Sequence, residues 1–138
     1  MKGSAVGPHA ALSLRAVHFE GSGTGCTVLE EITEAMVGFH EHYYGRRPTT
    51  AHSQMMGDDL LACILGDMYT DVEKTLIEMQ RQALVHESRS AFQRAMEPRF
   101  VKLVERISGR RVEKFISTHH VGPDVEVELF VLGAATGG

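Results

Sequence analysis

Apolar residues recur every three or four positions in two stretches of the chain, the spacing of one helix face. In the first stretch they are Ile32, Ala35, Met36, Phe39 and Tyr43. Thr27 precedes this stretch as a candidate N-cap, and Gly45 followed by Pro48 closes it. We therefore expect a helix that begins at Val28 and ends at Gly45.

The second stretch is longer, and its apolar positions are Phe92, Met96, Phe100, Leu103 and Ile107. Thr70 or Asp71 caps the region, with Glu73 close behind in the pattern of a capping box. The expected helical region runs from Val72 to Ser108 and contains one or two breaks. The clearest candidate for a break is Pro98, because proline lacks the amide donor and clashes with the preceding turn.

Four shorter segments have the composition of strands. His52–Met56 and Leu60–Leu65 flank a short polar connection, and Arg111–Thr118 and Val125–Leu132 form a second pair. The order α-β-β-α-β-β predicts an α+β fold, with a four-stranded, mostly antiparallel sheet and the helices on one face. The residues expected to be buried in this fold are Phe39, Ile64, Phe92 and Phe100.

The last predicted strand, Val125–Leu132, begins with an alternation of apolar and acidic residues. Its apolar side consists of Val125, Val127, Leu129 and Val131. Glu126 and Glu128 occupy the other side, where they are either an acid pair or, as the pattern favours, the solvated face of an edge strand. An edge of this kind would pair with a second copy, so we expect a homo-oligomer.

Length and composition indicate one domain: the chain has 138 residues, of which 43% are hydrophobic. Glycine and proline punctuate residues 1–27, for which we expect a flexible leader with one extra strand at Leu12–Phe19 as an alternative. The α+β domain is expected to span residues 28–132, and the small residues of 133–138 to form a flexible tail.

Charge and cysteine content narrow the functional classes. The net charge of −4 argues against a nucleic-acid-binding protein. No apolar run approaches the roughly 20 residues of a membrane span, so we expect no direct insertion into a membrane. Cys26 and Cys63 are too few for a disulfide framework, which favours the reducing cytoplasm.

Two pairs of arginines follow the predicted helix ends: Arg46 and Arg47, and Arg110 and Arg111. Cations at these positions complement the partial negative charge of the helix C-terminus, which is a sufficient structural explanation. The functional alternative is a pocket for a carboxylate or a phosphate, which arginine binds through two hydrogen bonds. Tyr43 and Tyr44 are expected either in the core or, with Phe39, lining a ligand cleft against the sheet.

Histidines near the ends of two predicted elements are the candidate metal ligands. His40 and His119, with Asp124, could contribute to one site, but adjacent or alternate histidines cannot share it because they point in different directions. We therefore assign no metal site. The sequence also lacks a glycine-rich phosphate loop and the neighbours that a serine or cysteine nucleophile needs, so we assign no cofactor and no catalytic residue.

Several segments together resemble the MpsC-like domain, a small bacterial family. They are Phe39–Pro48, Tyr69–Leu76, Arg89–Gln93, Gly109–Val112 and Pro123–Leu132. The family pattern Gly-Arg-Gly-Pro after the first helix is changed here, because Arg47 replaces the second glycine. The resemblance implies association with a sodium-translocating, membrane-potential-generating system, in which the family is the small soluble component. It supplies no catalytic residues.

We therefore expect a non-enzymatic accessory or regulatory domain that acts through protein partners, in association with a membrane transport complex. The alternative is a sensor or enzyme that binds a small molecule or an anion through Arg46, Arg47, Arg110 and Arg111.

Overall fold

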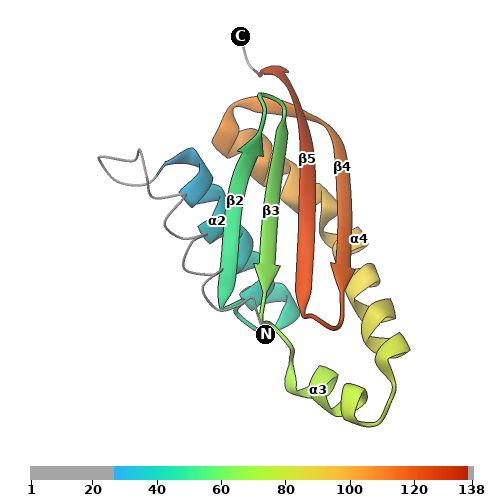
Figure 1. Cartoon of the computed structure of the whole chain (residues 1–138). Coiled ribbons are helices and arrows are strands. Elements are labelled where there is room, and N and C mark those ends of the chain that lie inside the picture. Colours follow the sequence, from blue (N-terminus) through green and yellow to red (C-terminus); the bar gives the residue numbers. More distant parts are fainter. Residues whose placement is uncertain (1–26, 137–138) are drawn as a thin grey trace.

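The computed structural model describes residues 27–136. Its sheet contains β2 (Thr50–Met56), β3 (Leu60–Gly66), β4 (Arg110–His120) and β5 (Val125–Ala135). They lie in the order β2-β3-β5-β4, and every neighbouring pair is antiparallel (Figure 1). The α+β prediction is thereby confirmed.

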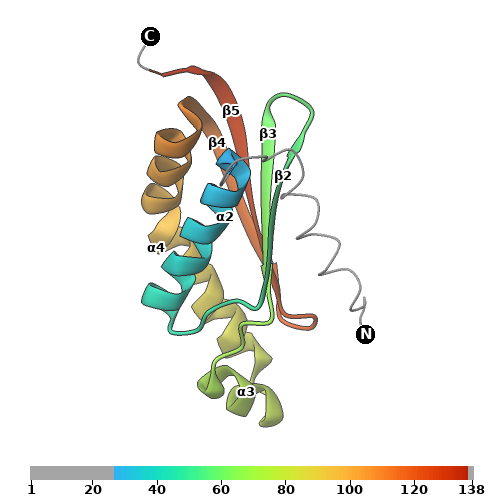
Figure 2. The same ribbon diagram turned by 90° about the vertical axis from the view of Figure 1, so that its left-hand side faces the viewer.

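Helices precede and separate the two hairpins. α2 (Val28–Phe39) runs into a π-helical turn, η1 (His40–Tyr44), and α3 (Asp71–Glu78) precedes the long α4 (Gln82–Ser108). Figure 2 shows α2 and α4 together on one face of the sheet, with α3 beyond the sheet's end. Thr27 is the N-cap of α2, as predicted, and it forms a capping box with Glu30; the predicted capping box of Thr70 and Glu73 is present at the start of α3.

The prediction of a break at Pro98 is wrong. α4 continues through this residue, which is exposed, so water can reach the turn that loses an amide donor. The break lies earlier, between α3 and α4, where Gln80 has a positive φ of 61°. This break lets α3 turn away from the line of α4.

The core lies between the sheet and the two packed helices. Its largest contributions come from Met36 of α2, Leu65 of β3, Phe100 of α4 and Phe130 of β5, each fully buried. Burying a side chain of this size contributes about 1.5–3 kcal/mol. Of the other residues expected to be buried, Phe39 and Phe92 pack against this core while keeping partial exposure. Ile64 is also only partly buried.

The expectation that Glu126 and Glu128 lie on the solvated face of an edge strand is wrong. β5 is an interior strand, and both glutamates are 0% exposed. The register explains their position: Glu128 lies opposite the buried Cys63, and Glu126 lies opposite the buried Leu65. Directly opposite residues share a face of the sheet, so both carboxylates point toward the helices.

The strand boundaries extend beyond those expected from the sequence. β5 continues to Ala135, three residues past Leu132, into the segment expected to be a flexible tail. The expected leader with its extra strand, residues 1–26, and residues 137–138 lie outside the described part of the chain.

Candidate functional site

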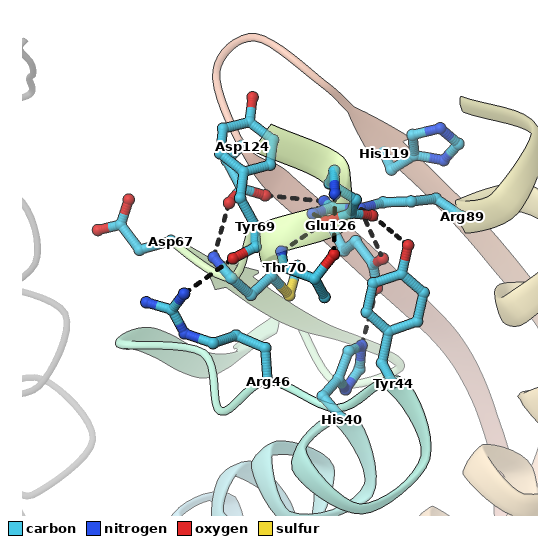
Figure 3. A network of polar contacts seen from close by, with 12 residues as sticks. His40, Tyr44, Arg46, Asp67, Tyr69, Thr70, Arg89, His119, Asp124 and Glu126 are labelled. Atoms are coloured by element: carbon cyan, nitrogen blue, oxygen red, sulfur yellow. Dashed lines mark hydrogen bonds and ion pairs between the residues drawn. The ribbon is translucent and has the colours of Figure 1, made fainter. Parts of the chain in front are cut away.

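The end of the first helix directs two side chains toward a buried cluster of charges. At η1 the backbone widens, and the amide of Gly45 bonds the carbonyl of His40 at 3.1 Å. His40 and Tyr44 lie about one turn apart, and both face the cluster (Figure 3). Such π-helical turns occur frequently at functional sites.

Arg89 of α4 is the centre of this cluster and is 0% exposed. Its Nε and Nη2 donate to the two carboxylate oxygens of Glu73 at 3.0 and 2.8 Å. Its Nη1 donates to Asp124 at 2.7 Å. The guanidinium also lies 5.7 Å from the ring centroid of Tyr44 and 5.4 Å from that of Tyr69. One buried cation thus holds α3 and the β4–β5 turn against α4.

Glu73 is the only buried residue of α3. It accepts hydrogen bonds from the Tyr44 hydroxyl and from the Thr70 amide, in addition to those from Arg89. Burial acts to raise the pKa of Glu73, but the bonds from Arg89 and Tyr44 outweigh it and lower the pKa. Burial and the adjacent carboxylate raise the pKa of Tyr44 to about 12. At neutral pH the carboxylate is therefore charged and the phenol is not.

Asp124 fixes the turn between β4 and β5 to the end of β3. Its Oδ2 accepts the amide of Met68 at 2.6 Å, while Oδ1 accepts from Arg89. Burial raises the pKa of Asp124, and Arg89 opposes that increase. The side chain therefore acts here as a structural acceptor.

His40 and Glu126 meet in the interior beside Arg89. Nδ1 of His40 lies 2.9 Å from the carbonyl of Met36, and Nε2 lies 2.8 Å from Oε1 of Glu126. Burial acts to lower the pKa of His40, but the bond to Glu126 and its charge outweigh burial and raise the pKa. The imidazole also stacks on Phe100, with ring centroids 5.7 Å apart.

Glu128 lies two residues further along the same face of β5. It accepts hydrogen bonds from the Ser117 hydroxyl of β4 and from Nε2 of Gln93, the latter at 3.0 Å. Burial raises the pKa of Glu128 to about 8. His40, Glu126 and Glu128 thus lie close together in the interior.

The first predicted arginine pair divides between two environments. Arg46 donates to the carbonyl of Tyr69 at 2.8 Å and is partly buried. Arg47 is exposed and forms ion pairs with Glu41 and Glu34 at 3.2 and 3.4 Å. Only Arg46 therefore faces the cluster.

The second pair lies at the opposite end of β3. Arg110 donates to the carbonyls of Gly133 and Asp58 at 2.9 and 2.7 Å and to the carboxylate of Asp59 at 3.0 Å. It thereby ties the last hairpin to the β2–β3 turn, while Arg111 is exposed. The two arginine loops do not converge on one pocket.

The remaining candidates are also separated. Tyr43 is 46% exposed and packs against Phe39, whereas Tyr44 joins the cluster. His119 contacts His86 and Gln93 at 3.1 Å each. Burial and the neighbouring imidazole lower the pKa of His119.

The potential metal ligands that converge within residues 27–136 differ from the expected set. They are His40, Glu126 and Glu128, not His40, His119 and Asp124. His40 was therefore recognised from the sequence, and its two nearest carboxylates were not.

The sequence contained a signal for the missed residues of α4. Val85, Arg89, Gln93, Met96 and Phe100 repeat at helical spacing, and all five are buried. Arg89 and Gln93 thus interrupt an apolar stripe. A charged residue on such a stripe needs a buried partner, which is here Glu73.

The site is a buried network of ion pairs and hydrogen bonds. It consists of carboxylates, the Arg89 guanidinium that pairs with Glu73 and Asp124, and the His40 imidazole. The thiol nearest to it, Cys63, is 0% exposed, and burial raises its pKa to about 12, so it stays a thiol at neutral pH.

Comparisons with known proteins give one match. The family model described as "Na+-translocating membrane potential-generating system (MpsC)" matches residues 26–134. No curated protein and no solved structure gives a significant match to the chain. None of the helices formed by residues 27–136 combines the length and the apolar character of a membrane span.

Proposed function

This chain belongs to the MpsC family, and from that premise we propose that it is a non-enzymatic accessory subunit that binds membrane proteins of a sodium-translocating system. The contact is made through α3 and the start of α4, on the cytoplasmic side of the membrane. The family description links the chain to such a system, and the exposed side chains of α3 support the choice of surface.

The observation that carries this proposal is the way in which α3 is held. A surface helix normally buries its apolar residues and exposes its charged ones. In α3 the buried residue is Glu73, whereas Val72 is 68% exposed. Met79 after the helix is 64% exposed, and Leu84 at the start of α4 is 45% exposed. The ion pair with Arg89 thus anchors the helix and leaves apolar side chains free for a partner.

A shallow cavity of about 260 Å³ adds to this surface. It is lined by Asp71, Val72, Thr75 and Leu76. An apolar side chain of a partner fits a depression of this kind, in the manner of an anchor residue at a protein interface. We define the partner surface as Val72, Leu76, Met79 and Leu84.

The alternative function, anion binding, is supported by one cavity. Arg46 and Lys74 line a volume of about 280 Å³ next to Tyr69, where they could receive a carboxylate or a phosphate. Asp67 and Asp124 line the same cavity and oppose an anion there. The partner surface therefore remains our preferred site.

The test compares membrane binding of two variants. Val72→Asp combined with Met79→Asp places charges on the partner surface, whereas Val28→Asp changes a residue that is 48% exposed at the start of α2. We expect the first variant to lose co-sedimentation with membranes that contain the sodium-translocating system, and Val28→Asp to retain it. Equal melting temperatures verify folding. Unchanged co-sedimentation of the double variant would contradict the proposal.

A further inference from the structure

One group of three buried side chains has the composition of a metal site. His40, Glu126 and Glu128 each offer a ligand atom, and these atoms lie within 4.8 Å of one another. All three residues are 0% exposed. We propose that they bind a divalent transition-metal ion. The proposal is independent of the partner surface on α3.

The hydrogen bonds of His40 provide the first argument. Its Nδ1 lies 2.9 Å from the carbonyl of Met36, which can only accept, so Nδ1 carries a proton. In the neutral ring, Nε2 then presents a lone pair to Oε1 of Glu126, 2.8 Å away. Two acceptors at this distance need a positive centre between them. A metal ion or a proton supplies it.

Glu126 provides the second argument, because a proton on His40 satisfies only one of its oxygens. Oε2 of Glu126 is buried and has no hydrogen-bond partner within the described part of the chain. Nε of Arg89 lies 4.0 Å from this oxygen, beyond hydrogen-bonding distance. A metal ion between the carboxylates would complete the coordination of this oxygen.

The balance of charge agrees with a bound cation. Arg89 is matched by Glu73 and Asp124, with which it makes short ion pairs. Glu126 forms its short ion pair with His40, and Glu128 accepts hydrogen bonds from the neutral groups of Ser117 and Gln93. Burial without an adjacent cation disfavours the charged form of Glu128, and a divalent ion would stabilise that form.

Residues around the three ligands hold them in place, as is usual at metal centres. The Met36 carbonyl orients His40, and Ser117 and Gln93 donate to Glu128. Ser117 and Gln93 also line a cavity of about 350 Å³ between α4 and β4. The cavity thus reaches the two residues that donate to Glu128, while Glu128 itself is fully buried behind them.

The ligand set selects the class of metal. Imidazole together with carboxylates suits zinc, manganese, iron or nickel. Hard cations such as magnesium and calcium take oxygen ligands instead, and the same argument applies to sodium. The site is therefore distinct from any binding of the sodium ion that the family description names.

The experiment uses the full chain after dialysis against a chelator. Calorimetric titration and thermal melting are performed with Zn²⁺ and Mn²⁺, and with Mg²⁺ and Na⁺ as controls. We expect Zn²⁺ or Mn²⁺ to bind with one ion per chain and to raise the melting temperature. Mg²⁺ and Na⁺ should do neither. Absence of binding by both transition metals would overturn the proposal and leave a proton as the shared positive centre.

Variants locate the bound ion. Glu126→Gln should fold, because its amide can donate to Nε2 of His40, and it should lose at least about tenfold in affinity. Ser117→Ala removes only a hydrogen bond to Glu128 and should lower the affinity for the metal ion about 10–100-fold. It replaces Glu126→Gln as the test variant if Glu126→Gln does not fold. His86→Gln removes one member of the exposed His86–His119 pair, a surface chelator, and should bind as the wild type does. Binding that His86→Gln abolishes and Ser117→Ala preserves would overturn the proposal.

Discussion

Replacement of Arg89 by methionine removes the only guanidinium in the buried cluster while retaining much of the side-chain volume. Arg89 makes two charge-assisted hydrogen bonds to Glu73 and one to Asp124. Each is worth about 1.5–3 kcal/mol, but part of that energy offsets the cost of burying the charges. Removal of one member of a buried ion pair destabilises proteins by about 3–5 kcal/mol, which we take as the expected loss.

The assay is urea unfolding followed by far-UV circular dichroism. Arg47→Ala is the matched control, since its two ion pairs involve side chains that are more than half exposed, and it should cost less than about 1 kcal/mol. Combining Arg89→Met with Glu73→Gln should recover part of the loss, because the double variant no longer buries an unpaired Glu73 carboxylate. If Arg89→Met costs no more than Arg47→Ala, the cluster does not hold the fold together.

Three further predictions follow from individual residues. Glu73→Gln should destabilise the protein most at neutral pH, because folding lowers the pKa of Glu73. The carboxylate therefore stabilises the fold above pH 4.5, and this contribution is lost as the pH falls through the folded pKa. An equal difference in urea stability between variant and wild type at every pH would contradict this prediction. Light scattering of the wild type should give a mass above the 15.2 kDa of one chain. Ile116 of β4 is 53% exposed, and Ile116→Lys should reduce the mass toward 15.2 kDa. A monomeric wild type would refute the predicted oligomer. If the chain binds anions instead, phosphate should raise the melting temperature of Arg47→Ala but not that of Arg46→Ala. The reason is that Arg46, unlike Arg47, lines the cavity beside Tyr69. If phosphate does not shift the melting temperature of the wild type, phosphate is excluded as the ligand of this cavity.

Helical spacing and capping residues were sufficient to predict most of the fold. Thr27 is the expected N-cap, Thr70 forms the expected capping box, and the four strands pair as the two expected hairpins. The pattern in β5 was harder to interpret. Alternation shows that Glu126 and Glu128 share a face, but only the register with β3 shows that this face is the inner one.

The site was only partly predictable for the same reason. His40 and Asp124 were recognised by residue type, yet the residue that joins Asp124 to Glu73 is Arg89, in the first third of α4. The convergence of α3, α4 and the β4–β5 turn on Arg89 depends on tertiary packing. Spacing within one helix cannot reveal it.

The anchoring of α3 by one ion pair connects the buried cluster with the proposed partner surface. Glu73 is followed by exposed or partly exposed residues through the end of the helix. A perturbation of Arg89 should therefore affect partner binding as well as stability, because it releases the helix that carries Val72.

Photo-crosslinking from position 79 tests the partner surface most directly. A photoreactive amino acid replaces Met79, which is 64% exposed, and a second protein carries it in place of Val28 as a control. Both are irradiated in membranes that contain the sodium-translocating system. We predict that position 79, and not position 28, forms a covalent adduct with a membrane protein of that system, identified by mass spectrometry. Adducts of equal yield at both positions, or none at position 79, would contradict the proposed role of α3.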